Sequence, residues 1–290
     1  MPVNLTVVGK TDVGQERKTN EDAFVIADLA GESLVGDQHI ARFEVGQRGV
    51  LLAVSDGMGG HQAGEVASAL VVESLHRSMV RQSRPGPIDA LLEKAAVRAN
   101  REVWEAAHVP GRENMGATLT AVFIHDATAY IAEVGDSRAY LVRNGHIKQV
   151  TKDQSYVQLM VDSGAMSPAE ARKSELSSVI LQAMGLKESV QIAIGRLALC
   201  QGDCFVLCSD GLSSLVNADE IREIVLRAGP IDAVCARLIE LANKRGGDDN
   251  ITVIVAVPSA LACRLKPTIA PLASAVRSSL STLSAHSVKT

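Results

Sequence analysis

Five apolar segments of this 290-residue chain each carry one or two carboxylates at one end, often beside a glycine. A carboxylate at the end of a buried strand is costly to desolvate, and several brought together would repel one another. Divalent cations bound between the acids would relieve both problems. The acids concerned are Glu21, Asp22, Asp56, Asp136, Asp210, Asp248 and Asp249.

The types of these residues indicate a hard cation. The candidate ligands are nearly all carboxylates, without a histidine or cysteine set, which favours Mg²⁺, Mn²⁺ or Ca²⁺ over Zn²⁺. The step from Asp56 to Gly57 lets the backbone turn sharply and offers a carbonyl oxygen with no side chain in the way. No segment holds enough acids for a calcium loop of the EF-hand type, so we expect a centre assembled from distant parts of the chain.

Each of these residues also has an ordinary structural interpretation. An Asp-Gly step after a strand is most often a turn, and Glu21 and Asp22 could be solvated acids. Arg17, close to these acids in the sequence, could form a surface ion pair, and His61 among glycines could be an exposed loop residue. The metal-site hypothesis therefore depends on the joint pattern and not on any single residue.

The segments that must position the acids form strands and paired helices. Short β-branched runs predict strands near residues 4–11, 22–28, 49–57, 117–126, 127–145, 203–211 and 250–257. Apolar residues at helical spacing predict helices over residues 63–82, 87–107, 217–229 and 230–247. Two helices that follow each other in the sequence, with no strand between them, argue against a parallel βαβ sheet. They predict an α+β fold, in which helical layers cover antiparallel sheets.

Three further segments have their own signals. The letters RNGH at residues 143–146 predict a tight hairpin turn. Residues 153–190 are polar and mixed, and we expect two short helices with irregular chain at one edge of the core. Residues 258–290 are rich in Ser, Ala, Pro and Leu, which indicates a tail with one weak helix near residues 272–283. The expected domain therefore covers residues 1–257.

Composition and charge exclude several classes of protein. The chain is 47% apolar, enough for one large core, and its formal net charge of −4 provides no basic surface for nucleic acid or anionic membrane. Aromatic residues make up only 3%, too few for stacking on single-stranded nucleic acid. No apolar run approaches the ~20 residues of a membrane span, and the N-terminus lacks the pattern of a secretory signal.

The cysteines indicate a reducing compartment. Their count is odd, so we expect free core thiols in a cytoplasmic protein and not a disulfide framework or a metal site. They are Cys200, Cys204, Cys208, Cys235 and Cys263.

Six segments, in this order, resemble the bacterial branch of the metal-dependent serine/threonine protein phosphatases, the protein phosphatase 2C family. They are RKTNEDAF, VSDGMGGHQAGEVAS, GATLTAVFI, AEVGDSRAYLVRNG, CSDGL and GGDDNITVIV, and the match spans residues 9–257. The resemblance implies a four-layer α-β-β-α sandwich of two antiparallel sheets with a pair of helices outside each. It also implies a binuclear Mn²⁺ or Mg²⁺ centre in a cleft at one end of the sandwich.

The resemblance assigns the ligands of these two cations residue by residue. Asp56 would bridge both ions. Glu21 and the Gly57 carbonyl would complete one of them, and Asp210 and Asp249 would hold the other. A hydroxide shared by the two ions would attack phosphorus in line, without a covalent enzyme intermediate. The chain has no Cys-x₅-Arg loop, which argues against a cysteine-dependent phosphatase.

The resemblance also implies the surrounding machinery. Asp136, with Asp210, would hold a third and weaker ion that bacterial members bind. Asp22 would orient metal-bound water, and Arg17 would grip the phosphate of the substrate.

The general acid is not assigned by the resemblance. Animal members have a histidine directly after the Asp-Gly step, where this chain has Met58, and His61 lies three residues further on. We therefore expect metal-bound water to supply the proton. Residues 153–190 would form the flap beside the cleft, and the part KSELSSVILQAMG lacks basic residues that many relatives carry there.

The expected function is hydrolysis of phosphoserine and phosphothreonine in proteins, in opposition to Ser/Thr kinases. The expected partners are phosphoproteins and the kinases that modify them, with no nucleic acid and no membrane span, and nothing in the sequence demands more than a monomer. One alternative is a non-catalytic binding module on the same fold, but such a module usually loses metal ligands and none is lost here. Another is a regulatory phosphatase that acts on anti-sigma-antagonist proteins, which would differ in substrate only.

Overall fold

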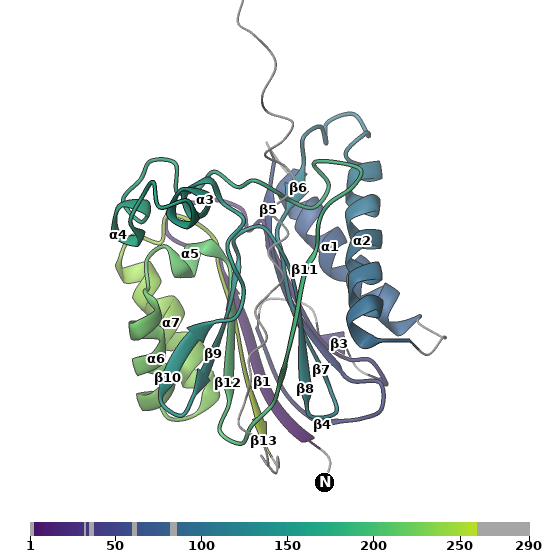
Figure 1. Ribbon diagram of the computed structural model, residues 1–290, viewed down its shortest axis with the longest axis vertical. Helices are drawn as coiled ribbons and strands as arrows, with labels where there is room; N and C mark the ends of the chain where they lie inside the picture. The colour runs from purple at the N-terminus through teal and green to yellow at the C-terminus, as the bar shows by residue number, and fades with distance from the viewer. Residues whose placement is uncertain (1–2, 32, 35–37, 60–62, 82–85, 260–290) are drawn as a thin grey trace, which may run out of the picture.

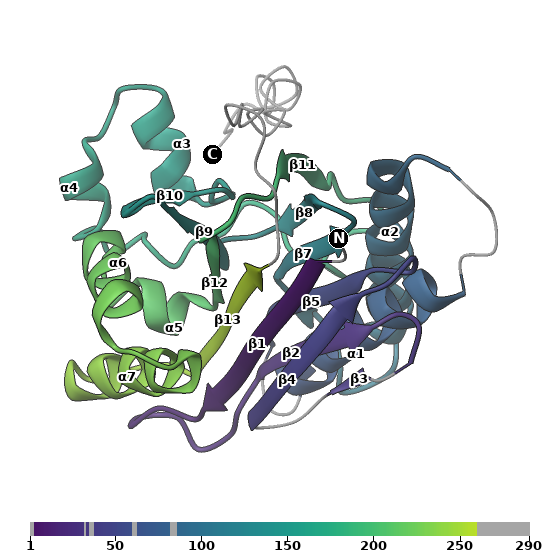
Figure 2. The same cartoon turned by 90° about the horizontal axis from the view of Figure 1, so that it is seen from below.

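A computed structural model describes residues 3–31, 33–34, 38–59, 63–81 and 86–259 of the protein. Two antiparallel sheets lie face to face, and a pair of helices covers the outer side of each (Figure 1; Figure 2). This arrangement confirms the predicted α+β sandwich of four layers. His61, Cys263 and the predicted helix near residues 272–283 lie outside the described residues.

The first sheet has the strand order β10-β9-β12-β13-β1-β4. Asn144 and Gly145 connect β9 to β10 with φ angles of 51° and 76°, the left-handed conformations that a two-residue hairpin turn requires. The predicted hairpin is therefore confirmed. The strands are β1 (Val3–Asp12), β4 (Gln38–Val45), β9 (Arg138–Arg143), β10 (His146–Gln149), β12 (Cys204–Cys208) and β13 (Ile251–Ser259).

The second sheet has the strand order β11-β8-β7-β5-β2-β3, and the short strand β6 pairs with the end of β5. β5 is central and buried along most of its length, as its apolar run predicts. The strands are β2 (Asp22–Asp28), β3 (Ser33–Leu34), β5 (Val50–Met58), β6 (Gly116–Ala117), β7 (Leu119–His125), β8 (Thr128–Val134) and β11 (Ala193–Ala198).

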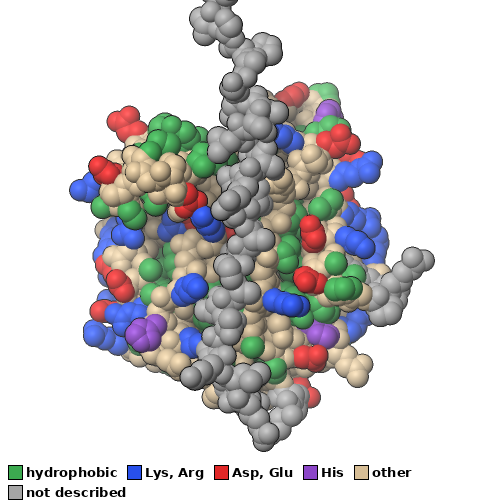
Figure 3. All heavy atoms as spheres, in the orientation of Figure 1, with side chains coloured by type: hydrophobic (Ala, Val, Ile, Leu, Met, Phe, Trp, Pro, Cys, Tyr) green, Lys and Arg blue, Asp and Glu red, His purple; other side chains and the backbone are tan. Residues whose placement is uncertain are grey.

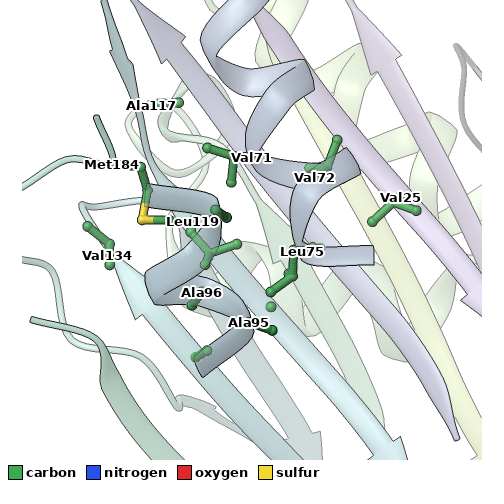
Figure 4. Packing of buried hydrophobic residues seen from close by; sticks show 14 of the residues in the cluster. Val25, Val71, Val72, Leu75, Ala95, Ala96, Ala117, Leu119, Val134 and Met184 are labelled. Atoms are coloured by element: carbon green, nitrogen blue, oxygen red, sulfur yellow. The ribbon is translucent and has the colours of Figure 1, made fainter. Parts of the chain in front are cut away.

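Three apolar layers hold the sandwich together. Between the sheets, Phe24 and Leu52 of one sheet pack in a single cluster with Phe205 of the other. The helices α1 (Ala63–Val80) and α2 (Ile88–Ala106) cover the second sheet, where Val71 and Leu75 face Leu119 (Figure 4). The helices α6 (Ala218–Arg227) and α7 (Ile231–Lys244) cover the first sheet through residues such as Leu238.

The segment after β10 forms two short helices, as predicted. In α3 (Tyr156–Asp162), Ser155 caps the first turn, and in α4 (Pro168–Ala171) Ser167 and Glu170 form a capping box. Both lie at the same end of the sandwich as the short helix α5 (Asp210–Ser213) (Figure 1). The exposed apolar residues Leu176, Val179 and Leu181 belong to the same segment.

The surface and the cysteines agree with the sequence analysis. On the face shown in Figure 3, acidic and basic side chains are interspersed, so no large basic patch is visible there. No helix in the described part of the chain has both the length and the apolar character needed to span a bilayer. Cys204, Cys208 and Cys235 are free thiols in the core, as predicted, and Cys200 is buried as well.

Candidate metal centre

Strand direction brings the predicted acids to one end of the sandwich. Asp22 opens β2 and lies directly opposite Asp56, near the end of the antiparallel strand β5. Asp210 follows β12, whereas Asp249 precedes the antiparallel strand β13, so these two also share one edge. Asp136 lies in the turn between β8 and β9. We call the group of Glu21, Asp22, Asp56, Asp136, Asp210 and Asp249 the acidic cluster.

The carboxyl groups of the acidic cluster interact with one another. Burial, and then the charges of Asp22 and Asp210, raise the pKa of Asp56 well above its ordinary value. Asp56 and Asp210 also share a side-chain hydrogen bond, which requires a proton between two carboxylates. Burial raises the pKa of Asp22 and of Asp136 to about 8 each, and the charge of Asp210 adds to the effect in both. Without a cation, these acids therefore hold protons that ordinary carboxyl groups have lost.

Two oxygens of the acidic cluster are buried without a hydrogen-bond partner. They are Oδ1 of Asp22 and Oδ1 of Asp210. A buried acceptor with no hydrogen-bond partner is costly in free energy, and a bound cation would satisfy it. A set made of oxygen ligands alone fits Mn²⁺ or Mg²⁺.

No group of three or more His, Cys, Asp or Glu residues, among those that the structure describes, is already arranged to hold a metal ion. The orphaned oxygens and the raised pKa values indicate that the residues fit a cation.

Glycines allow three backbone segments to meet beneath Glu21. A Cβ atom on Gly57 would lie 2.1 Å from the carbonyl oxygen of Gly64 and 2.6 Å from that of Glu21. A Cβ atom on Gly64 would lie 2.6 Å from Oε2 of Glu21. Gly64 is in the first turn of α1, so the Glu21 carboxylate lies where the helix dipole favours negative charge.

Three polar residues that sequence reasoning missed fix the acidic cluster in place. Asn250 is 4% exposed, and its Oδ1 accepts the backbone N–H of Glu21 at 2.7 Å. The hydroxyl of Ser209 donates to Oδ2 of Asp22 at 2.7 Å. Thr118 Oγ1 accepts the backbone N–H of Asp56 at 2.9 Å. The available signal was a polar residue where an apolar run begins or ends, as in NITVIVAV and CFVLCSDG.

The comparisons with known proteins agree with this geometry. The model of the family "Protein phosphatase 2C" matches residues 32–252. The chain belongs to the protein phosphatase 2C family. It is 43% identical, over 211 residues, to the serine/threonine protein phosphatase PstP of Mycobacterium tuberculosis, a match that covers 71% of this chain and 40% of PstP. The predicted family is therefore confirmed, although the match spans less than half the length of PstP.

Two further comparisons cover more of the matched chain. Protein phosphatase PhpP of Streptococcus pneumoniae is 33% identical over 249 residues, which cover 84% of this chain and 93% of PhpP. The crystal structure of the PstP catalytic domain in complex with two manganese ions superposes with a TM-score of 0.73 at 34% identity. That comparison covers 88% of this chain and 99% of the solved one.

The remaining predicted residues of this protein phosphatase 2C member lie around the acidic cluster. Arg17 is half-exposed, and its Nη2 donates to Oδ2 of Asp249 at 2.8 Å. Burial acts to lower the pKa of Arg17, but the charges of Asp249, Glu21 and Asp56 together outweigh it and raise that pKa. Asp248, next in the chain, is exposed and is not part of the acidic cluster.

The contact beneath Glu21 gives a first prediction. Gly57→Ala should lower the free energy of unfolding by about 3 kcal/mol, because the added methyl group meets two carbonyl oxygens and not flexible side chains. Denaturant unfolding with chelator present measures this loss. Gly46→Ala is the matched control, since a Cβ atom there would meet nothing within 4 Å. Equal stability of the two variants would contradict the close packing of these backbones.

Proposed function

We propose that this protein is a metal-dependent serine/threonine protein phosphatase that hydrolyses phosphoserine and phosphothreonine in proteins. The acidic cluster is the observation that carries the proposal, since two of its buried oxygens have no hydrogen-bond partner. Similarity to PstP and PhpP, which are named as protein phosphatases, supports the reaction. The two manganese ions in the PstP structure support Mn²⁺ or Mg²⁺ as the cations.

The ligand roles in this proposal follow the position of each acid. Asp56 would bridge two cations, which is supported by its interaction with acids from both sheets. Glu21 and the Gly57 carbonyl would serve one of them, and Asp210 and Asp249 the other. When bound, such a pair of cations would activate water near neutral pH and stabilise charge on the phosphoryl oxygens.

The chain itself would orient water and substrate. Asp22 is held through Oδ2 by Ser209, which leaves its Oδ1 to orient the attacking water. Arg17 lies at the exposed rim of the acidic cluster, where its planar guanidinium could bind phosphate oxygens. Asp136, with Asp210, would hold a third cation, which is supported by the repulsion between these two carboxylates.

The proposal extends to the substrates, the oligomeric state and the cellular location of the protein. The substrates would be phosphoproteins produced by Ser/Thr kinases, and the segment containing α3 and α4 would be the flap that meets them. The protein would act as a monomer, which is supported by an acidic cluster whose residues all come from one chain. The free thiols of Cys204, Cys208 and Cys235 support a reducing cytoplasm as its location.

A phosphatase assay with and without metal tests the proposed function. The purified chain should hydrolyse para-nitrophenyl phosphate and a phosphothreonine peptide with Mn²⁺, and chelation should reduce the rate at least about a hundredfold. Turnover that survives chelation would refute the metal mechanism. Calorimetry that detects no Mn²⁺ binding, together with no turnover, would favour a non-catalytic binding module instead.

A further inference from the structure

The side chain of Gln154 joins the turn that carries Asp136 to the rest of the molecule. Gln154 is 6% exposed. Its backbone N–H donates to the carbonyl oxygen of Gly135 at 2.7 Å, and its Oε1 accepts the N–H of the same glycine at 3.1 Å. Its Nε2 also donates to the carbonyl oxygen of Glu133 at 3.5 Å. Gln154 therefore forms hydrogen bonds with both the N–H and the carbonyl oxygen of Gly135, the residue directly before Asp136.

The same residue also holds the far part of the segment that contains α3 and α4. The carbonyl oxygen of Gln154 accepts the N–H of Leu181 at 2.7 Å, and Oε1 accepts a hydrogen bond from Nε2 of Gln182 at 3.3 Å. Next to these contacts, Ser155 and Ile180 form an isolated β-bridge. Gln154 thus closes the base of the segment 155–182.

Apart from an ion pair between Lys152 and Asp162 at 2.6 Å, few contacts within the described residues fix this segment. Between residues 156 and 182 only Ala171 is buried, so few apolar contacts decide where the segment lies. Its other attachment follows directly, where Met184 enters the core (Figure 4) and the fully buried Asn100 binds the backbone. Asn100 accepts the N–H of Gly185 at 2.8 Å and donates to two carbonyl oxygens, those of Lys187 and Glu188.

The turn that carries Asp136 is constrained on its other side as well. Gly135 has a φ angle of 102°, and a Cβ atom there would lie 2.8 Å from Cγ2 of Thr118. Thr118 Oγ1 in turn forms a hydrogen bond with Ser137 at 2.7 Å and accepts the N–H of Asp56. The turn is therefore held between Thr118 and Gln154.

We propose that Gln154 is a positioning residue that couples cation binding at Asp136 to the ordering of the segment 155–182. Because one buried amide fixes both, a cation that holds Asp136 stabilises the segment, and an ordered segment raises the affinity for that cation. Asn100 holds the same segment but none of its hydrogen bonds reaches the turn at Asp136. This proposal rests on the proposed function, because it takes Asp136 as a cation ligand.

The test compares Gln154→Met with Asn100→Leu. Gln154→Met keeps about the same side-chain volume, and Asn100→Leu keeps the branched shape of the side chain. Each substitution removes three side-chain hydrogen bonds. Gln154→Met should raise the dissociation constant of the weakest Mn²⁺ site about tenfold, as expected for a residue that supports a ligand. Asn100→Leu can act on this site only through the segment, so its effect on the dissociation constant should be clearly smaller. Calorimetric titration with Mn²⁺ measures both.

Hydrogen exchange supplies a readout that a purely structural role would not change. In the natural protein, Mn²⁺ sufficient to fill the weakest site should increase amide protection across residues 156–182, and in Gln154→Met this increase should disappear. Should Gln154→Met fail to fold, Gln182→Met removes one of the same contacts and should produce a smaller change of the same sign.

Two results would overturn the coupling. One is unchanged Mn²⁺ affinity and protection in a folded Gln154 variant, and the other is an equal loss of affinity in Asn100→Leu, which would indicate general destabilisation. Failure of the proposed function is a different result, in which the natural protein itself neither binds Mn²⁺ nor hydrolyses a phosphopeptide.

Discussion

Asp56→Asn is expected to abolish turnover while the chain stays folded. Asp56 interacts with Asp22, Asp136 and Asp210, so one substitution removes the ligand that the proposed cations would share. The loss should be at least about 4 kcal/mol of transition-state stabilisation, which is roughly a thousandfold in rate. Hydrolysis of para-nitrophenyl phosphate with saturating Mn²⁺ measures it.

The same variant should lose its activity without losing stability in the absence of metal. Burial and the neighbouring acids raise the pKa of Asp56 well above its ordinary value, so the metal-free protein favours the neutral form of this residue. Asparagine has nearly the same shape and is also neutral, and its amide can donate to Asp210. The melting temperature with chelator should therefore change little, while the rise in melting temperature on adding Mn²⁺ should be lost.

Asp126→Asn is the matched control for this experiment. Its side chain is 82% exposed in the turn between β7 and β8, and its φ angle of 50° is one that asparagine tolerates. Normal turnover is expected from this control. Substantial turnover by Asp56→Asn would show that the acidic cluster does not carry the reaction.

The sequence predicts the fold where hydrophobic patterns are strong. Apolar runs such as that of β5, and the paired helices α1–α2 and α6–α7, have long periodic signals and lie where they were expected. The strands β3, β4 and β11 were not predicted. β4 lies at one edge of its sheet, where even Ile40 is 56% exposed. Its sequence mixes polar and apolar residues and therefore resembles that of a loop. The short helix α5 was also missed, because its residues continue directly from β12.

The sequence predicts the acids of the site better than the residues that hold them. Carboxylates at strand ends are visible because they interrupt apolar runs, and antiparallel pairing then brings them to one edge. Asn250 stands at the start of an apolar run, but neither it nor Gln154 reveals its partners, since their hydrogen bonds join residues that are far apart in the chain. The choice between Asp248 and Asp249 likewise depends on the fold, which exposes the first and pairs the second with Arg17.

The metal-free protein is expected to lose stability as pH rises from 6.5 to 8. Asp22 and Asp136 have a pKa of about 8 in the folded chain, against the ordinary 3.8 in the unfolded one. Between these values the folded state holds protons that the unfolded state has released, so unfolding becomes easier as pH increases. Each acid that keeps its proton accounts for about 1.4 kcal/mol per pH unit in this window.

Other titrating groups do not hide this trend. The pKa of Glu220 is lowered to about 2, chiefly by its hydrogen bond with Arg245, so its contribution to stability is lost only in acid, well below this window. Burial lowers the pKa of His76, which makes stability rise with pH, but mainly below about 6.5, the ordinary value. The comparison is therefore made between pH 6.5 and 8, with chelator present throughout.

Mn²⁺ should reverse the sign of this dependence. Carboxylates must be deprotonated to bind a cation, so Mn²⁺ affinity increases between pH 6.5 and 8, where the metal-free protein loses stability. The difference in melting temperature between saturating Mn²⁺ and chelator should therefore be larger at pH 8 than at pH 6.5, by at least about 5 °C. Thermal melts at four combinations of pH and metal measure it. A chelated protein that gains stability towards pH 8 would mean that the carboxylates of the acidic cluster are already stable as anions, and the case for a cation between them would then fail.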